Sequence, residues 1–224
     1  MIESMTKKQK EYIKKFKGKK IAVLGIGVSN VPVIEFLIKA GAKVVACDIK
    51  EKSQLGTAYE KIADLPIEFR FGKDYLKGLL EFDMMFPTPG MPLSIPELVE
   101  SRSKGVLQSN EIGLFFDLCE APIIGITGSD GKTTTTTLIS EILKADGKNV
   151  FTGGNIGNPL LSQVFDISSD SVVVLELSSF QLQPLKKSPH IGVVLNVYPN
   201  HLDHHKTMNE YAKAKENIFK YQKP

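Results

Sequence analysis

Cysteine is scarce in this sequence of 224 residues, and its two cysteines, Cys47 and Cys119, stand alone without a Cys-x-x-Cys pair. Small secreted domains rely on disulfide frameworks, so this usage favours a reducing compartment. No apolar run approaches the ~18 residues of a membrane-spanning helix, and residues 1–20 lack the apolar core of a secretory signal. We therefore expect a cytoplasmic protein that does not enter the membrane.

Basic charge is concentrated at one end of the chain. Eight of the 28 Lys and Arg residues lie in residues 1–20 with only two of the 25 Asp and Glu residues, so the rest of the chain is slightly acidic. Such a basic segment can contact nucleic acid or a membrane, although a solvated helix is the commoner outcome. Because the rest of the chain has no basic stripe, we expect no nucleic-acid partner.

Short apolar segments alternate with helical patterns along the whole chain. The apolar segments are rich in Val, Ile and Phe and hardly alternate with polar residues, which is typical of parallel strands covered on both faces. We expect strands at 20–24, 43–47, 67–71, 82–86, 106–108, 123–127, 150–152, 172–175 and 191–197, and helices at 31–40, 111–118, 133–145 and 209–221. The pattern predicts an α/β protein with a Rossmann-like domain at residues 1–118 and part of a P-loop-type α/β domain at residues 119–224.

A phosphate-binding loop is predicted between the strand at 123–127 and the helix at 133–145. Residues 127–133 read Thr-Gly-Ser-Asp-Gly-Lys-Thr. Glycines let main-chain N–H groups face a phosphate, Lys132 can reach phosphate oxygens, and the Thr133 hydroxyl can hold Mg²⁺. The strict Walker pattern has a glycine where Ile126 stands, so this loop is a variant, and an ordinary glycine-rich turn is the alternative.

Three further polar residues follow expected strands of the same domain. Glu176 ends a buried strand, where a carboxylate is unfavourable unless it is paired or bound to a metal such as Mg²⁺. Asn155 lies in a glycine-rich segment, and His201 follows the strand at 191–197. Because ligands bind beyond the carboxyl ends of such strands, we expect one common rim. A capping role for Glu176 and a plain loop around Asn155 stay open.

Lys215 lies on the apolar stripe of the expected helix at 209–221. Successive helical residues rotate by ~100°, so Lys215 falls close to Tyr211, whereas Lys213 and Lys220 fall on the far face. Desolvation favours the neutral amine, which can react with CO₂ to form a carbamate anion able to hold Mg²⁺. A lysine that extends its amine to solvent is the alternative.

A second glycine-rich turn, Gly25-Ile26-Gly27-Val28-Ser29-Asn30, links the first strand to the first expected helix. With Asp48 at the end of the next strand, it resembles a dinucleotide-binding fingerprint, but Asn30 stands where a third glycine would allow close helix–sheet packing. The turn favours recognition of part of a nucleotide; an NAD site and a structural turn are alternatives. Thr88-Pro89-Gly90 could present N–H groups to a ligand or be only a stiff turn.

These motifs occur together in the order found in the Mur ligase family, which the sequence resembles from about Lys19 onward. Residues 178–182, Ser-Ser-Phe-Gln-Leu, are similar to the D-glutamate-adding members in particular. The segments that carry the resemblance are 126–133, 153–157, 175–182, 196–203 and 211–215. The resemblance implies an ATP-dependent, ADP-forming ligase of peptidoglycan precursor synthesis, which joins D-glutamate to UDP-N-acetylmuramoyl-L-alanine through an acyl phosphate.

The resemblance also implies roles for individual residues, with the first domain binding the UDP part of the substrate and the second binding ATP and two Mg²⁺ ions. The substrate positions are Val28, Ser29, Asp48, Ile49, Lys50 and Gly90. The ATP positions are Ser129, Asp130, Gly131, Lys132, Thr133, Thr134 and Asn155. The metal positions are Thr133, Glu176, His201 and Lys215, the last as a carbamate, and catalytic roles fall to Lys132, His201 and Lys215.

Three departures from the family pattern qualify this expectation. Asp130 stands where Asn is commoner, Asn30 replaces a frequent Gly, and the chain stops at Pro224, inside what resembles the ATP-binding domain. The sequence therefore predicts a monomeric N-terminal fragment without the C-terminal D-glutamate-binding domain, which binds the UDP-sugar but does not ligate alone. The alternative functions are a related Mur ligase or folylpolyglutamate synthase, an NAD-dependent oxidoreductase, and a non-catalytic nucleotide-binding module.

Overall fold

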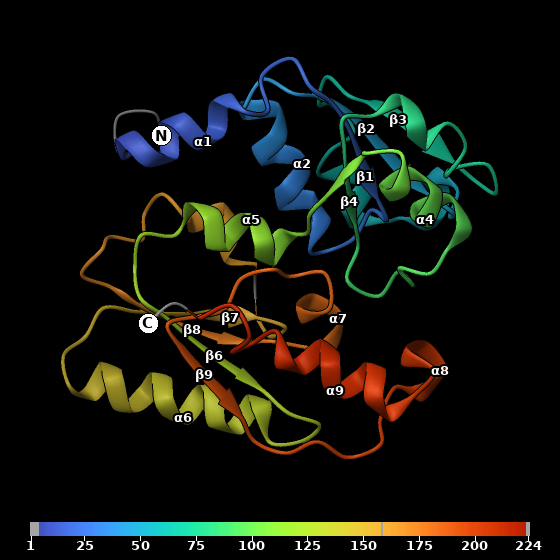
Figure 1. Cartoon of the computed structure of the whole chain (residues 1–224). Helices are drawn as coiled ribbons and strands as arrows, with labels where there is room; N and C mark the ends of the chain where they lie inside the picture. Colours follow the sequence, from blue (N-terminus) through green and yellow to red (C-terminus); the bar gives the residue numbers. More distant parts are fainter. Residues whose placement is uncertain (1–4, 158, 223–224) are drawn as a thin grey trace. The chain divides into compact units, whose positions relative to one another are not determined.

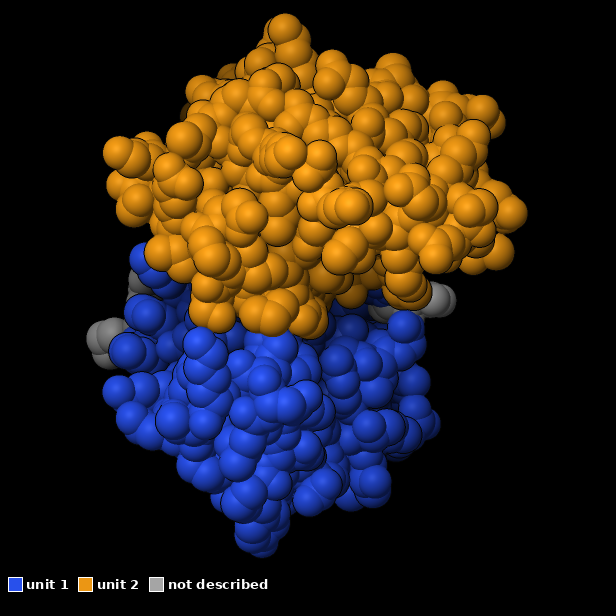
Figure 2. All heavy atoms as spheres, turned by 90° about the vertical axis from the view of Figure 1, so that its right-hand side faces the viewer, with its two compact units in different colours: residues 1–4, 112–224 blue, residues 5–111 orange. Residues whose placement is uncertain are grey.

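The computed structural model describes residues 5–157 and 159–222 of the chain (Figure 1). The chain divides into two compact units, which Figure 2 colours separately. The N-terminal unit is Met5–Glu111, and the C-terminal unit contains Ile112–Pro224. The division falls at the start of helix α5 (Glu111–Leu118), whereas the sequence analysis placed the junction after this helix.

The N-terminal unit is a five-stranded parallel sheet, as expected for a Rossmann-like fold. Its strand order is β3-β2-β1-β4-β5, so the order reverses between β1 and β4. The strands are β1 (Lys20–Leu24), β2 (Lys43–Asp48), β3 (Glu68–Phe71), β4 (Met84–Pro87) and β5 (Leu107–Gln108). The helices are α1 (Lys7–Lys14), α2 (Asn30–Lys39), α3 (Thr57–Glu60) and α4 (Pro96–Ser103), with short 3₁₀ turns at Lys52–Gln54 and Leu79–Glu81. Every strand predicted for this part of the chain is present.

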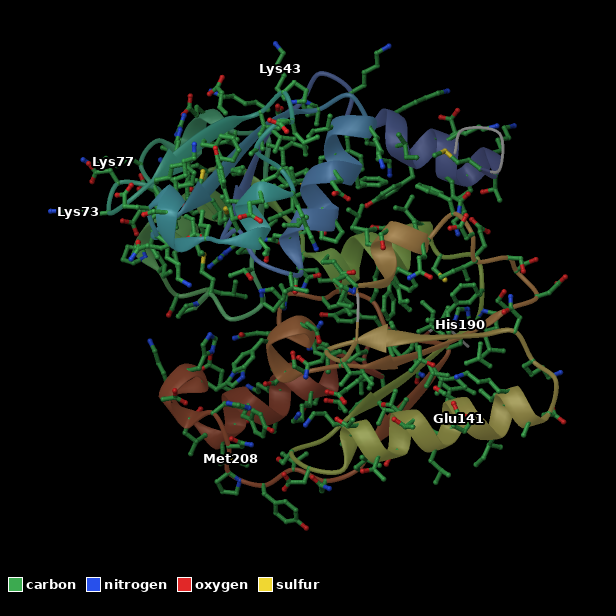
Figure 3. All side chains as sticks on the ribbon, turned by 180° about the vertical axis from the view of Figure 1, so that it is seen from behind. Lys43, Lys73, Lys77, Glu141, His190 and Met208 are labelled. Atoms are coloured by element: carbon green, nitrogen blue, oxygen red, sulfur yellow. The ribbon has the colours of Figure 1, made fainter. Side chains whose placement is uncertain are left out.

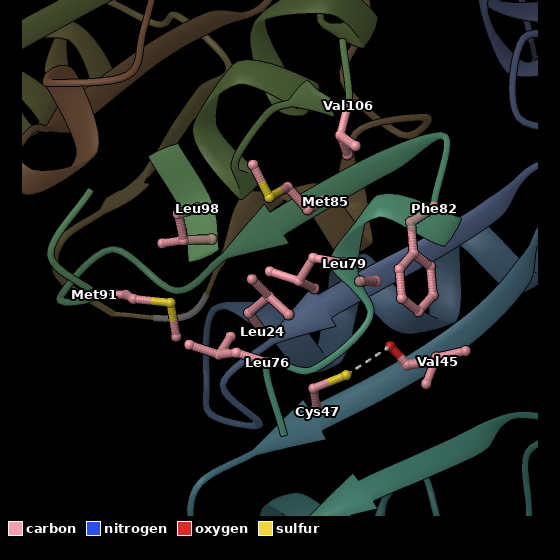
Figure 4. Close-up of a cluster of buried hydrophobic side chains, with 11 residues drawn as sticks. Leu24, Val45, Cys47, Leu76, Leu79, Phe82, Met85, Met91, Leu98 and Val106 are labelled. Atoms are coloured by element: carbon pink, nitrogen blue, oxygen red, sulfur yellow. Dashed lines mark hydrogen bonds between the residues drawn. The ribbon is translucent and has the colours of Figure 1, made fainter. Parts of the chain in front are cut away.

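Both faces of the three central strands, β2, β1 and β4, are buried, which explains why these strands hardly alternate in polarity. Because successive strand residues point to opposite faces, Leu24 and Met85 lie on one face within a cluster of eleven buried side chains (Figure 4). Ile21 and Val23, which belong to the opposite set, are also fully buried. Cys47 belongs to the cluster, and burial raises the pKa of its thiol to about 12, so it has little reactivity as a nucleophile.

The basic N-terminal segment forms helix α1. Thr6 and Gln9 make a reciprocal capping box at its start. Phe16, which follows the helix, is 3% exposed and packs edge-on against Phe36 with 5.7 Å between ring centroids. Elsewhere on the unit, Lys43 and Lys73 extend outward into solvent (Figure 3). The described part of the chain contains no helix with the length and apolar character needed to cross a membrane.

The C-terminal unit is a four-stranded parallel sheet with the order β7-β8-β6-β9. Helix α6 packs on β6, β7 and β8 (Figure 1). The strands are β6 (Ile123–Thr127), β7 (Val150–Gly154), β8 (Val172–Glu176) and β9 (Ile191–Val194). Besides α5, the helices are α6 (Lys132–Ala145), α7 (Ser179–Leu182), α8 (Leu202–His205) and α9 (Met208–Glu216), with a 3₁₀ turn at Leu160–Gln163.

Two predicted elements of this unit are too long. Strand β9 was expected to reach residue 197 but ends at Val194, because the chain then bends toward the loop after β6, where Ser129 N donates to the Asn196 carbonyl. Helix α9 was expected to reach residue 221 but ends at Glu216, after which Ile218 N bonds to Lys215 O in a tighter turn. Both endings depend on contacts that periodicity does not report.

Gly154 allows β7 to lie directly against the end of β8. Its φ is +96°, and a Cβ placed on it would be 2.2 Å from the Glu176 carbonyl oxygen. The next residue, Asn155, donates its main-chain N–H to that oxygen at 2.8 Å. This close approach sets Asn155 beside Glu176.

We predict that Gly154→Ala is far more destabilising than Gly147→Ala. Both glycines have positive φ, but a Cβ on Gly147 meets nothing within 4 Å. Gly147→Ala should therefore lower the free energy of unfolding by roughly 1–2 kcal/mol from backbone strain alone. Gly154→Ala adds a main-chain clash and should lower it by roughly 2–5 kcal/mol. Urea unfolding measures both, and equal losses would contradict the close approach.

Candidate functional site

The loop between β6 and α6 forms a P-loop-type turn. Gly131 has φ +80° and occupies the N-cap of α6, where no side chain caps the helix. The N–H groups of the first helical turn therefore remain available to an anion. The Lys132 amine folds back over the turn and donates to the carbonyls of Gly128 at 3.0 Å and Ser129 at 2.7 Å.

Asn196 braces this loop, a role that the sequence analysis did not assign. Its Oδ1 accepts the main-chain N–H groups of Ser129 and Asp130, both at 3.0 Å, and its Nδ2 donates to the Asp130 carbonyl at 3.2 Å. The Ser129 hydroxyl also has a partner, because it lies 3.1 Å from the Tyr211 hydroxyl. Ser129 is a buried residue, 6% exposed. Two of the predicted ATP positions thus have main-chain donors already paired with Asn196. From the sequence, Asn196 was expected inside the strand at 191–197, and it begins the segment 196–203 that carries the family resemblance.

Glu176, Thr133 and Asn155 come together as one hydrogen-bonded group. The Thr133 hydroxyl donates to Glu176 Oε2 at 2.6 Å, and Asn155 Nδ2 donates to Oε1 at 2.8 Å. Glu176 is only 2% exposed, so these two bonds compensate for the burial of its carboxylate. Thr133 and Asn155 are exposed, which leaves the group open to solvent on one side.

The oxygen-rich donor set of this group suits a hard divalent cation. Mg²⁺ is commonly held by one or two carboxylates together with substrate phosphates, and Glu176 beside the Thr133 hydroxyl provides that combination. Within the described residues, no three His, Cys, Asp or Glu side chains gather as a metal-binding cluster. The donor set therefore fits a cation whose coordination is completed by a phosphate ligand.

Lys215 reaches the same loop from α9 and is 3% exposed, in agreement with its predicted place on the apolar stripe. Its amine donates to the Gly128 carbonyl at 2.8 Å and to the Thr127 hydroxyl at 3.2 Å, and it lies 4.7 Å from the Tyr211 ring centroid. Burial, together with the charge of Lys132, lowers the pKa of Lys215 to about 8. Two lysine amines therefore share one main-chain carbonyl.

His201 lies in a different setting from the other predicted metal positions. It is exposed, adopts a left-handed φ of 53°, and precedes α8. Its ring packs edge-on against Phe180, with 4.9 Å between centroids, and lies 6.4 Å from the ring of Tyr211. Its connection to the phosphate-type loop therefore runs through Tyr211, which contacts both Ser129 and Lys215.

His205 is a buried residue that the sequence analysis did not single out. It is fully buried, its Nε2 lies 2.9 Å from the Ser179 hydroxyl, and its ring stacks on Phe180. Desolvation, followed by the neighbouring His204, lowers the pKa of His205. It therefore joins α8 to α7. Helix periodicity gives little signal over a four-residue helix.

The six predicted substrate positions of the N-terminal unit lie at or just beyond the carboxyl ends of β1, β2 and β4. Asp48 is the buried member, and its carboxylate accepts the N–H groups of Ile26 at 2.6 Å and Lys50 at 2.8 Å. It therefore holds the loop after β1 against the loop after β2. Val28 and Ile49 are 72% and 64% exposed. Ser29 lies next to Val28 on the first of these loops, and Lys50 and Gly90 are exposed.

Two parallel α/β units with glycine-rich turns at their strand ends are typical of nucleotide-binding proteins. Residues 19–108 match the family model described as "Mur ligase MurD-like, N-terminal domain", and residues 126–224 match "Mur ligase middle domain". The chain belongs to the Mur ligase family.

Three curated relatives of this chain carry the name UDP-N-acetylmuramoylalanine--D-glutamate ligase. The protein of Symbiobacterium thermophilum is 54% identical over 203 residues, which cover 91% of this chain and 45% of the relative. The protein of Acetivibrio thermocellus is 49% identical over 97% of this chain and 47% of the relative. The protein of Clostridium botulinum strain Hall is 47% identical over 99% of this chain and 48% of the relative. The chain spans about half the length of the curated relatives it matches.

Solved structures support the fold. The UDP-N-acetylmuramate:L-alanyl-gamma-D-glutamyl-meso-diaminopimelate ligase from Neisseria meningitides superposes with a TM-score of 0.57 at 19% identity, over 92% of this chain and 69% of that one. The UDP-N-acetylmuramate-alanine ligase from Thermotoga maritima superposes with a TM-score of 0.50 at 25% identity, over 89% and 46%. The predicted α/β fold class is confirmed.

We predict that Lys215 makes the stability of the chain depend on pH above about 8. Between a native pKa of about 8 and the ordinary value of 10.5, the native state has released a proton that the unfolded state still holds. Stability therefore rises with pH in this window. We compare the free energy of unfolding of the wild type with that of Lys215→Met. The difference, wild type minus variant, should increase from pH 8 to pH 10 and stay constant below pH 7.

Urea unfolding at several pH values measures this difference. Lys213→Met serves as the control, because Lys213 lies on the same helix and is exposed. Its pH profile should run parallel to that of the wild type. Parallel profiles for Lys215→Met as well would contradict a lowered pKa of Lys215.

Proposed function

We propose that this chain supplies the UDP-substrate and ATP-binding units of a cytoplasmic ligase that joins D-glutamate to UDP-N-acetylmuramoyl-L-alanine. One observation carries the proposal: the loop after β6 places the Lys132 amine and an uncapped helix start beside the Thr133–Glu176 pair. These are the parts that phosphoryl transfer requires, namely anion donors, a cation and a hard metal ligand. The names of the relatives that are 47–54% identical support the particular substrates.

The chemistry that we propose begins with the carboxylate of the alanyl substrate. One of its oxygens attacks the γ-phosphorus of ATP, the bond from that phosphorus to the bridging oxygen breaks, and ADP leaves. The amine of D-glutamate then attacks the acyl carbon, loses a proton and expels inorganic phosphate to form the amide. The protein's task is to position the reactants and offset their negative charge.

Phosphates of ATP would lie on the N–H groups that remain free after Asn196 has bound those of Ser129 and Asp130. These are the N–H groups at the uncapped start of α6, which includes Lys132, Thr133 and Thr134. To reach a phosphate oxygen, the Lys132 amine exchanges its two carbonyl acceptors for the phosphate. The N–H groups of Ser129 and Asp130 thus hold the shape of the loop, and those at the start of α6 are assigned to the anion.

We assign Mg²⁺ to the Thr133 hydroxyl and the Glu176 carboxylate. When bound there, the ion would offset charge on the transferring phosphoryl group. His201 and the carbamate of Lys215 are assigned to a second ion. The lowered pKa of Lys215 supports this step, because only the neutral amine adds to CO₂, forming an N–C bond and releasing a proton.

The uridine part of the substrate is assigned to the rim of the N-terminal unit. Val28 and Ile49 are large apolar side chains left exposed on loops that Asp48 holds together. Such side chains are suited to contact the faces of a base, while main-chain N–H groups near Ser29 and Gly90 are suited to polar groups. The assignment leaves Asp48 chiefly as a brace for both loops.

We predict that UDP-N-acetylmuramoyl-L-alanine stabilises this chain and that NAD does not. At a ligand concentration ~100-fold above Kd, the free energy of unfolding should rise by ~2.7 kcal/mol. Thermal unfolding with each ligand measures the effect. Ile49→Asp, at an exposed position, should reduce the shift without changing the melting temperature of the free protein. Stabilisation by NAD alone would point to an oxidoreductase instead.

We predict that Lys132→Met weakens binding of Mg·ADP roughly 10- to 100-fold, because a charge-assisted hydrogen bond to phosphate is lost. The half-buried amine bonds only to main-chain carbonyls, so the melting temperature should change little. Calorimetric titration measures the Kd. Lys144→Met is the matched control, since Lys144 lies in the last turn of the same helix and pairs with Glu141. An unchanged Kd in Lys132→Met would contradict the ATP assignment.

A further inference from the structure

Asn30 is the first residue of α2 and is fully buried. Its Nδ2 donates to three main-chain carbonyls: Leu24 at 3.2 Å, Gly25 at 2.9 Å and Phe86 at 3.3 Å. Only the nitrogen of a side-chain amide can donate to carbonyl oxygens, so its surroundings determine which way the amide faces. The acceptors span two neighbouring strands, since Leu24 ends β1, Gly25 follows it and Phe86 belongs to β4.

These two strands flank the point at which the strand order of the sheet reverses. Open parallel sheets bind their ligands in the crevice beyond the carboxyl ends of the strands at such a point. The loops on either side are already in contact, because Thr88 N donates to Leu24 O at 2.8 Å and a Cβ on Gly25 would lie 2.7 Å from Thr88 Cγ2. Asn30 adds a second link between the strand ends from which these two loops start.

The same side chain also carries a buried polar atom that has no hydrogen-bond partner. Asn30 Oδ1 is buried and has no hydrogen-bond partner. A buried acceptor without a donor is unfavourable, and the glycine that the dinucleotide-binding fingerprint has at this position would avoid it. Stability alone therefore gives a weak reason for asparagine here.

We propose that Asn30 is a positioning residue of the nucleotide site in the N-terminal unit. Its amide sets the spacing between the loop that carries Val28 and Ser29 and the loop that carries Thr88 to Gly90. It replaces with hydrogen bonds the close helix–sheet packing that a third glycine provides in dinucleotide-binding folds. The ligand class is a uridine nucleotide, and this inference rests on the proposed function.

The test compares ligand affinities of folded variants by calorimetric titration at a temperature well below their melting points. Asn30→Asp keeps the size of the side chain but places carboxylate oxygens against the three carbonyls. Asn30→Gly restores the fingerprint glycine and removes the link without adding repulsion. UDP probes the N-terminal unit, and Mg·ADP probes the C-terminal unit.

Asn217→Asp is the matched control. Asn217 is 8% exposed, and its Nδ2 donates to the carbonyls of Leu182 and Gln183 in the C-terminal unit. This variant loses a comparable buried donor far from the N-terminal rim along the chain. It should lower the melting temperature and leave the Kd for UDP unchanged.

We expect the Kd for UDP to rise about tenfold or more in Asn30→Asp and at least ~3-fold in Asn30→Gly, with the Kd for Mg·ADP unchanged in both. A folded Asn30→Gly variant that binds UDP as the wild type does would overturn the inference. Loss of folding in both variants would assign Asn30 a purely structural role and overturn it equally. A wild type that binds no UDP would refute the proposed function instead.

Discussion

In a parallel sheet every strand delivers its carboxyl end to the same edge, and the phosphate-type loop and its neighbours depend on that constraint. Glu176 ends β8, Asn155 follows β7 and the phosphate-type loop follows β6, so these groups meet although they come from separate segments. The meeting also requires that the strands approach closely, which Gly154 permits by bringing β7 against the Glu176 carbonyl. Chemistry at the rim therefore follows from strand direction and strand spacing together.

Hydrogen bonds as well as packing hold the segments at the carboxyl ends of the strands. In each unit, the side-chain amide of one asparagine links two of these segments. Asn30 links the ends of β1 and β4, and Asn196 links the loop after β6 to the segment after β9. Asn196 both donates and accepts, whereas Asn30 only donates, and each pairs main-chain groups at the ends of strands. Loops held in this way are preorganised before any ligand binds.

Electrostatics at the phosphate-type loop favours an anion. Lys132 and Lys215 share the Gly128 carbonyl as an acceptor, and Glu176 is the acidic partner of Thr133 rather than of either lysine. Burial moves the pKa of Lys215 down, whereas Lys132, the first residue of α6, is only half-buried. A phosphate ligand would supply a negatively charged partner for the Lys132 amine, which otherwise bonds to main-chain carbonyls.

Much of this architecture follows from the order of the amino acids. The strands, the two glycine-rich turns and the buried position of Lys215 are properties of short windows, in which hydrophobic period and turn chemistry are read directly. The end of β9 and the burial of His205 were missed because they depend on segments distant in the chain.

The packed fold alone decided which partners each polar group found. Thr133 meets Glu176 across 43 positions, Asp130 meets Asn196 across 66, and Lys215 meets Gly128 across 87. The periodicity of a short segment carries no information about which residue it meets so far away in the sequence. Hydrogen bonds between main-chain atoms and distant side chains form only once the sheets have brought both ends together, which is why the roles of Asn30 and Asn196 emerged from the structure.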